Sequence, residues 1–232
     1  MNKLWVFGDS YSEPFSKIGD SKEEWARIKR NYIAWKEYIP KCYGEIISDK
    51  LHLNNYNLAI GGADNYTILD SIISIIDSID TNDIIIIGWS NTLRFRVVNT
   101  NNNFTTIKAN NATKTVWAAE RVNSITGLSN STLTELIINR DSSKYIDELN
   151  NYIKLLNFLF KKNKIIHWSP FSQDKDGLMT THSILNRLEK ISEETNGMVN
   201  DGHFSENVHY ALADDFINII NSYKYPTDKK YI

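Results

Sequence analysis

The chain has 232 residues, of which 41% are hydrophobic and 23% are charged, and its formal net charge at pH 7 is −2. This balance is typical of a globular protein that buries a sizeable core, and it excludes a strongly basic nucleic-acid binder. The single cysteine, Cys42, excludes a framework of disulfide bonds and a zinc site built on paired thiolates.

No segment of the sequence has the pattern of a targeting signal or of a membrane helix. The apolar stretch at residues 4–7 is far too short for the core of a secretory signal peptide. The strongest apolar run elsewhere, residues 84–87, has the length of a strand, whereas a membrane helix needs roughly 20 residues. We therefore expect a cytoplasmic protein with no membrane partner. If the chain is of viral origin, association with a virion is the alternative.

Four short apolar runs predict buried parallel strands, and each run ends in small or polar residues. The runs are residues 4–7, 56–60, 84–87 and 164–168. Continuous apolar runs indicate strands that are covered on both faces, as in a sheet between two layers of helices.

Apolar residues recur about once per helical turn in three further segments, which predicts amphipathic helices. The residues are Ile68, Ile72, Ile76 and Ile79; Tyr145, Leu149, Ile153, Leu156 and Phe160; and Val208, Leu212, Phe216 and Ile219. Asp141 and Ser142 can cap the start of the second helix, and the third is expected to begin after Ser205. Strands that alternate with helices predict an α/β fold, a three-layer α/β/α sandwich with a mostly parallel sheet.

Two long segments do not fit this alternation. Residues 12–38 are charged and aromatic, and residues 97–140 are rich in Asn and Thr, with alternating apolar and polar residues at 104–107. Long excursions inside a compact domain are usually lids, binding loops or added hairpins. We interpret both segments as insertions over the active-site end of the sheet, within a single domain that spans residues 1–232.

Polar residues follow the predicted strands at the edge of the sheet where ligands bind in open α/β folds. The strand ends and the segment before the last helix supply Ser10, Gly62, Ser90, Asn91, Asp201 and His203. A hydroxyl, backbone donors, an amide side chain and an acid–imidazole pair are the groups that acyl transfer requires.

Three blocks of the sequence resemble those of the GDSL, or SGNH, hydrolases, and they occur in the order of that family. Gly8-Asp9-Ser10-Tyr11-Ser12 is similar to the first block. Asn57, five residues before Gly62, matches the spacing of the second block, and residues 201–209 resemble the last block. The resemblance spans nearly the whole chain and implies an SGNH hydrolase (flavodoxin-like) fold.

The sequence departs from the family pattern at two functional positions. The third block reads Gly88-Trp89-Ser90-Asn91 where the family has Gly-X-Asn-Asp, so either Ser90 replaces the oxyanion-hole Asn or Asn91 serves from the next position. Asp201 lies two residues before His203, whereas the acid of the family lies three residues before its catalytic histidine. Residues i and i+2 of an extended backbone share a side, so Asp201 can still reach the ring of His203.

The resemblance implies a serine esterase that hydrolyses a small acyl ester, with acetyl as the expected acyl group, on a carbohydrate or a short-chain lipid. Ser10 would be the nucleophile, His203 the base, and Asp201 the group that orients the imidazole. The backbone N–H groups of Ser10 and Gly62, together with Asn91 or Ser90, would form the oxyanion hole. The expected partner is a small-molecule or glycan ester, and no cofactor, metal or nucleic acid is expected.

An alternative hypothesis is a glycan-binding or structural module that keeps the same fold with weakened catalysis, which the altered third block motivates. The candidate substrate contacts are Trp89, Arg94 and His209. Asp9 is expected to stabilise the loop around Ser10, and His167 is interpreted as a core histidine. Nothing in the sequence sets the oligomeric state.

Overall fold

The computed structural model describes residues 2–17, 30, 33–34, 37–110, 115–116, 119–138, 142–171, 177–180 and 206–223. Asp201 and His203, and most of the expected insertion at residues 12–38, lie outside the described residues. Within them, no helix is long and apolar enough to cross a membrane.

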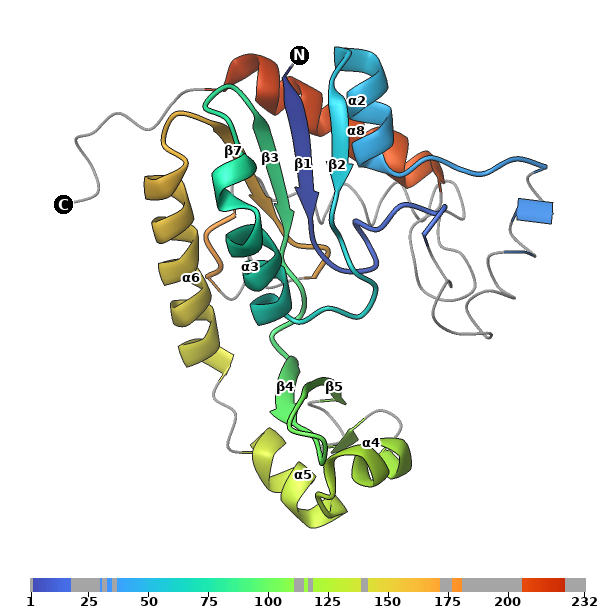
Figure 1. Ribbon diagram of the computed structural model, residues 1–232, viewed down its shortest axis with the longest axis vertical. Coiled ribbons are helices and arrows are strands. Elements are labelled where there is room, and N and C mark those ends of the chain that lie inside the picture. Colours follow the sequence, from blue (N-terminus) through green and yellow to red (C-terminus); the bar gives the residue numbers. More distant parts are fainter. Residues whose placement is uncertain are drawn as a thin grey trace.

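A parallel sheet of four strands forms the centre of the molecule (Figure 1). In chain order the strands are β1 (Lys3–Phe7), β2 (Asn54–Asn57), β3 (Ile84–Gly88) and β7 (Lys164–Trp168). Their spatial order is β2-β1-β3-β7, so β1 and β3 are the central strands. The register pairs Val6 with Asn57 on one side and with Ile86 on the other, which brings the carboxyl ends of these strands to one edge.

Alternate residues of each central strand enter two separate cores, because successive side chains of a strand point to opposite faces. Leu4 and Val6 belong to the core beneath helices α2 (Tyr43–Leu51) and α8 (Glu206–Ser222). The other face of the sheet packs against α3 (Asn65–Ser74) and α6 (Ser142–Leu159).

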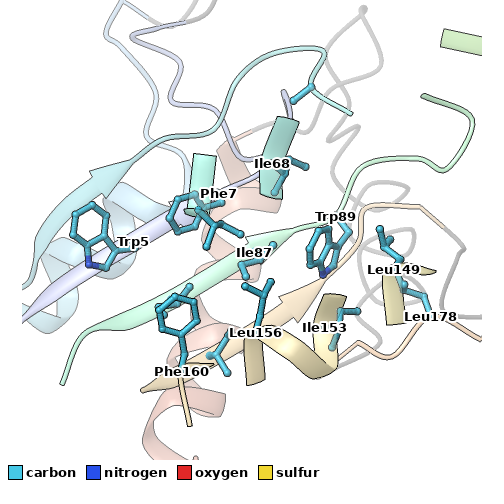
Figure 2. Packing of buried hydrophobic residues seen from close by; sticks show 14 of the residues in the cluster. Trp5, Phe7, Ile68, Ile87, Trp89, Leu149, Ile153, Leu156, Phe160 and Leu178 are labelled. Atoms are coloured by element: carbon cyan, nitrogen blue, oxygen red, sulfur yellow. The ribbon is translucent and has the colours of Figure 1, made fainter. Parts of the chain in front are cut away.

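Figure 2 shows this second core, in which Trp5, Phe7 and Ile87 of the sheet meet Ile68 of α3 and Ile153 of α6. Helices therefore cover both faces of a parallel sheet, and the predicted three-layer α/β/α fold is confirmed.

The segment between β3 and α6 builds a small unit with a core of its own. It contains a three-stranded antiparallel sheet, β4 (Arg94–Val98), β5 (Phe104–Asn110) and β6 (Thr115–Val116), followed by helices α4 (Ala119–Thr126) and α5 (Asn130–Ile138). Phe95, Ile107, Leu133 and Ile137 are among the residues of this core. Figure 1 places the unit beyond the carboxyl ends of the parallel strands. We call it the insertion unit.

Two elements differ from the expected bounds. Strand β2 ends at Asn57, whereas the apolar run predicted a strand at residues 56–60. Because β2 is an edge strand with Asn54 and Tyr56 exposed, apolar character does not mark its position. Helix α3 ends at Ser74 and is followed by a 3₁₀ turn, Ile76–Ser78, so the predicted helix is shorter than the periodicity indicated.

Helix α2 was not predicted from the sequence. Glu45 accepts a hydrogen bond at 2.9 Å from the backbone N–H of Cys42, the residue that precedes the helix, so its carboxylate satisfies a donor at the helix start. Cys42 is an uncommon residue at this position, which hid the signal. The helix buries Tyr43, Ile46 and Ile47.

Candidate active site

Ser10 lies in a tight turn directly after β1. The backbone N–H groups of Ser12 and Glu13 both donate to the carbonyl oxygen of Asp9, at 2.9 and 3.1 Å. The N–H of Tyr11 donates to the side chain of Asp9 at 3.1 Å. Asp9 thus closes the turn through its backbone and its carboxylate, and Ser10 sits partly exposed within it.

Ser12 anchors the far side of this turn in the interior. Its hydroxyl accepts a hydrogen bond from Tyr43 of α2, and its carbonyl oxygen accepts one from Asn57 of β2, both at 2.8 Å. A Cβ added to Gly8 would lie 2.4 Å from the Ser12 hydroxyl oxygen, and one added to Gly88 would lie 2.6 Å from it. The two strand-end glycines therefore make room for the buried Ser12 side chain.

The carboxylate of Asp9 is almost fully buried, with an exposed fraction of 1%, and it is paired with a cation from the insertion unit. Nη1 of Arg94 lies 2.7 Å from Oδ2 of Asp9. The hydroxyl of Ser90 donates to the same oxygen at 3.1 Å. These contacts agree with the expected role of Asp9 in stabilising the loop around Ser10.

The loop that carries Gly62 is joined to the end of β1. The N–H of Ile60 donates to the carbonyl oxygen of Gly8 at 3.0 Å, and the N–H of Ala63 closes the turn onto Ile60 at 3.0 Å. Gly62 has φ +82°, a conformation that favours glycine, and nothing lies within 4 Å of the position of an added Cβ. Gly62 is thus held at an exposed position on a loop that is bonded to the strand end next to Ser10.

The third block places Ser90 and Asn91 in different environments. Ser90 is fully buried; its N–H donates to Asn65 at 2.7 Å, and its hydroxyl donates to Asp9. Asn91 is partly exposed, and its side-chain oxygen accepts the N–H of Leu93 at 2.8 Å. The hydroxyl proton of Ser90 is therefore used in a buried hydrogen bond to Asp9. The side-chain oxygen of Asn91 accepts from Leu93, and its NH₂ group is the donor that this side chain can offer to a ligand.

The three candidate substrate contacts are all buried. Trp89 has no exposed surface, and its indole N–H donates to Nδ1 of His167 at 3.2 Å. Arg94 pairs with Asp9, and His209, which is 4% exposed, packs between the rings of Phe15 and Tyr43. The structure places Trp89 in the core. The ion pair with Asp9 accounts for the position of Arg94, and ring packing accounts for that of His209.

His167 is buried on β7, as expected for a core histidine. It accepts from Trp89, and its Nε2 lies 3.2 Å from the side-chain oxygen of Asn157. Burial lowers the pKa of His167 to about 3, so the ring is neutral at physiological pH.

The first turn of α8 packs against the segment that follows Ser10. The ring centroids of His209 and Phe15 lie 5.5 Å apart, and His209 also stacks on Tyr43, which holds Ser12. Glu206, the first residue of α8, is buried and accepts hydrogen bonds from the Tyr38 hydroxyl and from the N–H of Lys41. Helix α8 therefore begins beside the segment that follows Ser10.

Within the described parts of the chain, no group of three or more His, Cys, Asp or Glu side chains is placed to hold a metal ion. The one thiol, Cys42, is buried, and burial raises its pKa to about 12. Cys42 therefore stays protonated and packs as a small apolar residue.

No protein-family model and no curated protein matches the sequence. The structure is similar to an acetyl xylan esterase from the rumen bacterium Butyrivibrio proteoclasticus, with 12% identity and a TM-score of 0.45 over 95% of this chain and 64% of that chain. It is also similar to a carbohydrate esterase whose active site displays divergent catalytic and non-catalytic binding functions, with 15% identity and a TM-score of 0.44 over 96% of this chain and 65% of that chain.

A lipase/acylhydrolase from Enterococcus faecalis is similar with 14% identity and a TM-score of 0.36, over 98% of this chain and 100% of that chain. The chain spans less than two thirds of the length of the first two proteins.

Proposed function

We propose that the protein is a serine esterase in which Ser10 is the nucleophile. The observation that carries the proposal is the Ser10 turn, which residues of several elements hold in place: Tyr43 of α2, Asn57 of β2 and Arg94 of β4. The turn exposes Ser10 in part, while buried hydrogen bonds hold the residues on either side of it. A nucleophile held in this way is preorganised for attack on a bound ester. The blocks that resemble SGNH hydrolases contain the same serine.

His203 is proposed as the general base and Asp201 as the carboxylate that orients it. A serine hydroxyl needs a base to take its proton at neutral pH, and a histidine has a suitable pKa when unperturbed, about 6.5. The contact of the first turn of α8 with Phe15 supports this assignment, because His203 lies only a few residues before that helix. Asp201 would stabilise the imidazolium that forms as Ser10 attacks.

The oxyanion hole is proposed to consist of the backbone N–H groups of Ser10 and Gly62 and the side-chain amide of Asn91. Asn91 is preferred over Ser90 because the Ser90 hydroxyl is buried and donates to Asp9. These donors would hold the oxygen of the tetrahedral intermediate as the leaving alcohol takes the proton from His203. Water, activated by the same histidine, would then release the acyl group from Ser10.

The proposed substrate is a small acyl ester, with acetyl as the first choice and a carbohydrate as its carrier, as the family resemblance implies. The test is hydrolysis of p-nitrophenyl acetate and of acetylated oligosaccharides by the wild type, by Ser10→Ala and by Ser74→Ala. Ser74 is an exposed serine near the end of α3, so its variant controls for the substitution itself. We expect turnover by the wild type and Ser74→Ala only. Equal rates for wild type and Ser10→Ala would reject the assignment.

A glycan-binding module with weakened catalysis is the second candidate function. The burial of Ser90 at the altered third block favours it, because one candidate oxyanion donor is engaged elsewhere. Binding to a glycan array that persists in Ser10→Ala, with no hydrolysis of any ester tested, would support this candidate. Strong turnover of an acetylated glycan by the wild type would reject it.

A further inference from the structure

We propose that Arg94 is a positioning residue, which holds the Ser10 turn in place through Asp9 and so makes the insertion unit part of the active site. The proposal rests on the proposed function of Ser10 as the nucleophile. It assigns a role to the first strand of the insertion unit, β4.

The Asp9–Arg94 pair is buried on both sides. Asp9 is 1% exposed and Arg94 is 8% exposed, and the charged atoms lie 2.7 Å apart. The same nitrogen of Arg94 lies 3.1 Å from the Ser90 hydroxyl and 3.4 Å from the carbonyl oxygen of Ala63. Removing one partner of such a pair leaves a buried charge without compensation, which proteins tolerate poorly.

The carboxylate that Arg94 holds also fixes the backbone on both sides of Ser10. Asp9 precedes Ser10, and its Oδ1 accepts the N–H of Tyr11, the residue that follows Ser10. The other carboxylate oxygen, Oδ2, accepts from Arg94 and Ser90. A change in the position of this carboxylate is therefore transmitted to the Ser10 backbone, whose N–H is also a proposed oxyanion donor.

Arg96 lies two positions further along β4 and serves as the control for Arg94. Its ion pairs also attach the insertion unit to the core, but they do not involve Asp9. Residues i and i+2 of a strand share a face. The side chain of Arg96 lies 3.4 Å from Asp64, the residue that caps the start of α3, and 2.9 Å from Asp70 of α3. Both arginines thus join β4 to the α/β core through carboxylates, but only Arg94 contacts the residue before Ser10 in these ion pairs.

The experiment compares Arg94→Gln, Arg94→Lys and Arg96→Gln by steady-state kinetics on p-nitrophenyl acetate, with the folded fraction of each variant measured by circular dichroism. We expect kcat of folded Arg94→Gln to fall about 10²-fold with KM unchanged, the loss that follows from a small misplacement of a catalytic group. Arg94→Lys should recover part of kcat because its ammonium can still pair with Asp9. Arg96→Gln should keep the wild-type kcat.

Amide hydrogen exchange gives a readout that does not depend on catalysis. Tyr11, Ser12 and Glu13 donate their N–H groups to Asp9, so their exchange should be faster in Arg94→Gln and unchanged in Arg96→Gln. If the wild type hydrolyses no ester, the proposed function fails. The difference in amide exchange between Arg94→Gln and Arg96→Gln then decides on its own whether Arg94 holds the turn. Wild-type kcat in Arg94→Gln, equal losses in both glutamine variants, or unchanged exchange at these amides would overturn the proposal.

Discussion

The guanidinium of Arg94 lies 2.7 Å from the carboxylate of Asp9, although 85 positions of sequence separate the two residues. The pair joins the end of the first parallel strand to the first strand of the insertion unit. Asp9 directly precedes the proposed nucleophile, Ser10. Arg94 of the insertion unit therefore contacts the residue next to Ser10. The proposed active site therefore includes a residue of the insertion unit.

Replacing Asn91 tests the proposed oxyanion hole. We expect Asn91→Ala to lower kcat by about 10²–10³-fold, as removal of one oxyanion donor does in serine hydrolases. Asn91→Asp is the matched variant, because it can still accept the N–H of Leu93 but has no amide N–H to donate. Both variants should lose activity in assays with p-nitrophenyl acetate. Retention of activity by Asn91→Asp would show that another group stabilises the oxyanion.

Gly88→Ala tests whether the strand-end glycines make room for Ser12. The new Cβ would lie 2.6 Å from the Ser12 hydroxyl and 2.9 Å from Nε1 of Trp168. Overpacking of this kind costs about 1–3 kcal/mol, so the free energy of unfolding measured in urea should fall by that amount.

The double variant Gly88→Ala with Ser12→Ala is the control. It removes the nearest clashing atom, so its loss of stability should be smaller than the sum of the two single losses. An additive result, or an unchanged urea midpoint for Gly88→Ala, would contradict the packing described for this turn.

His167 predicts a pH dependence of stability. Burial lowers its pKa to about 3 in the folded protein, whereas the unfolded chain binds a proton near the ordinary value of 6.5. Between these values the unfolded state holds more protons, so the free energy of unfolding should fall as the pH falls from 6.5 toward 3. The slope from this one group approaches about 1.4 kcal/mol per pH unit.

His167→Asn should flatten this dependence, whatever its effect on stability at neutral pH. The measurement is urea unfolding of both proteins at several pH values from 7 to 4, compared by the difference in slope. Parallel curves for the two proteins would show that the buried ring of His167 takes up a proton in the folded state as readily as in the unfolded state.

Asp64 links helix α3 to the insertion unit. Its carboxylate is fully buried, accepts the N–H of Thr67 at the helix start at 2.8 Å, and accepts the hydroxyl of Thr106 on β5 at 2.7 Å. Asp64→Ala should lower the free energy of unfolding by about 1 kcal/mol for the helix cap and by roughly a further 1 kcal/mol for the partly buried Thr106 hydroxyl that loses its acceptor. Asp64→Asn keeps an acceptor and should lose less. Equal stability of both variants and the wild type would contradict this role.

Most of the fold could be predicted from the sequence because β1, β3 and β7 are buried along nearly their whole length. Residues 84–87 and 164–168 show continuous apolar runs, and the structure has β3 and β7 there. The helix predicted after Ser205 is α8, which begins at Glu206. Strand β2 was misplaced because it is an edge strand with exposed residues, which have no continuous apolar pattern. Helix α2 was missed because Cys42 at its start is a weak signal for a helix.

The candidate site was predicted less completely, because its long-range contacts have no local signature. The sequence indicated that Asp9 stabilises the Ser10 loop, but nothing near Arg94 marked Asp9 as its partner. Likewise, Trp89 was a candidate substrate contact, whereas the structure buries it against His167. A strand-end position thus identifies the edge of the sheet where a site forms, but not the direction of each side chain.

The most direct test of Ser10 as the nucleophile is the site of covalent modification by a fluorophosphonate probe. The probe phosphonylates a serine that an adjacent base has activated. We therefore expect one adduct on the intact protein, mapped by tandem mass spectrometry to Ser10 and absent from Ser10→Ala. Labelling should also be lost in His203→Ala, which removes the proposed base. An unmodified wild-type protein, or an adduct on another residue that persists in Ser10→Ala, would contradict the assignment of Ser10 as the nucleophile.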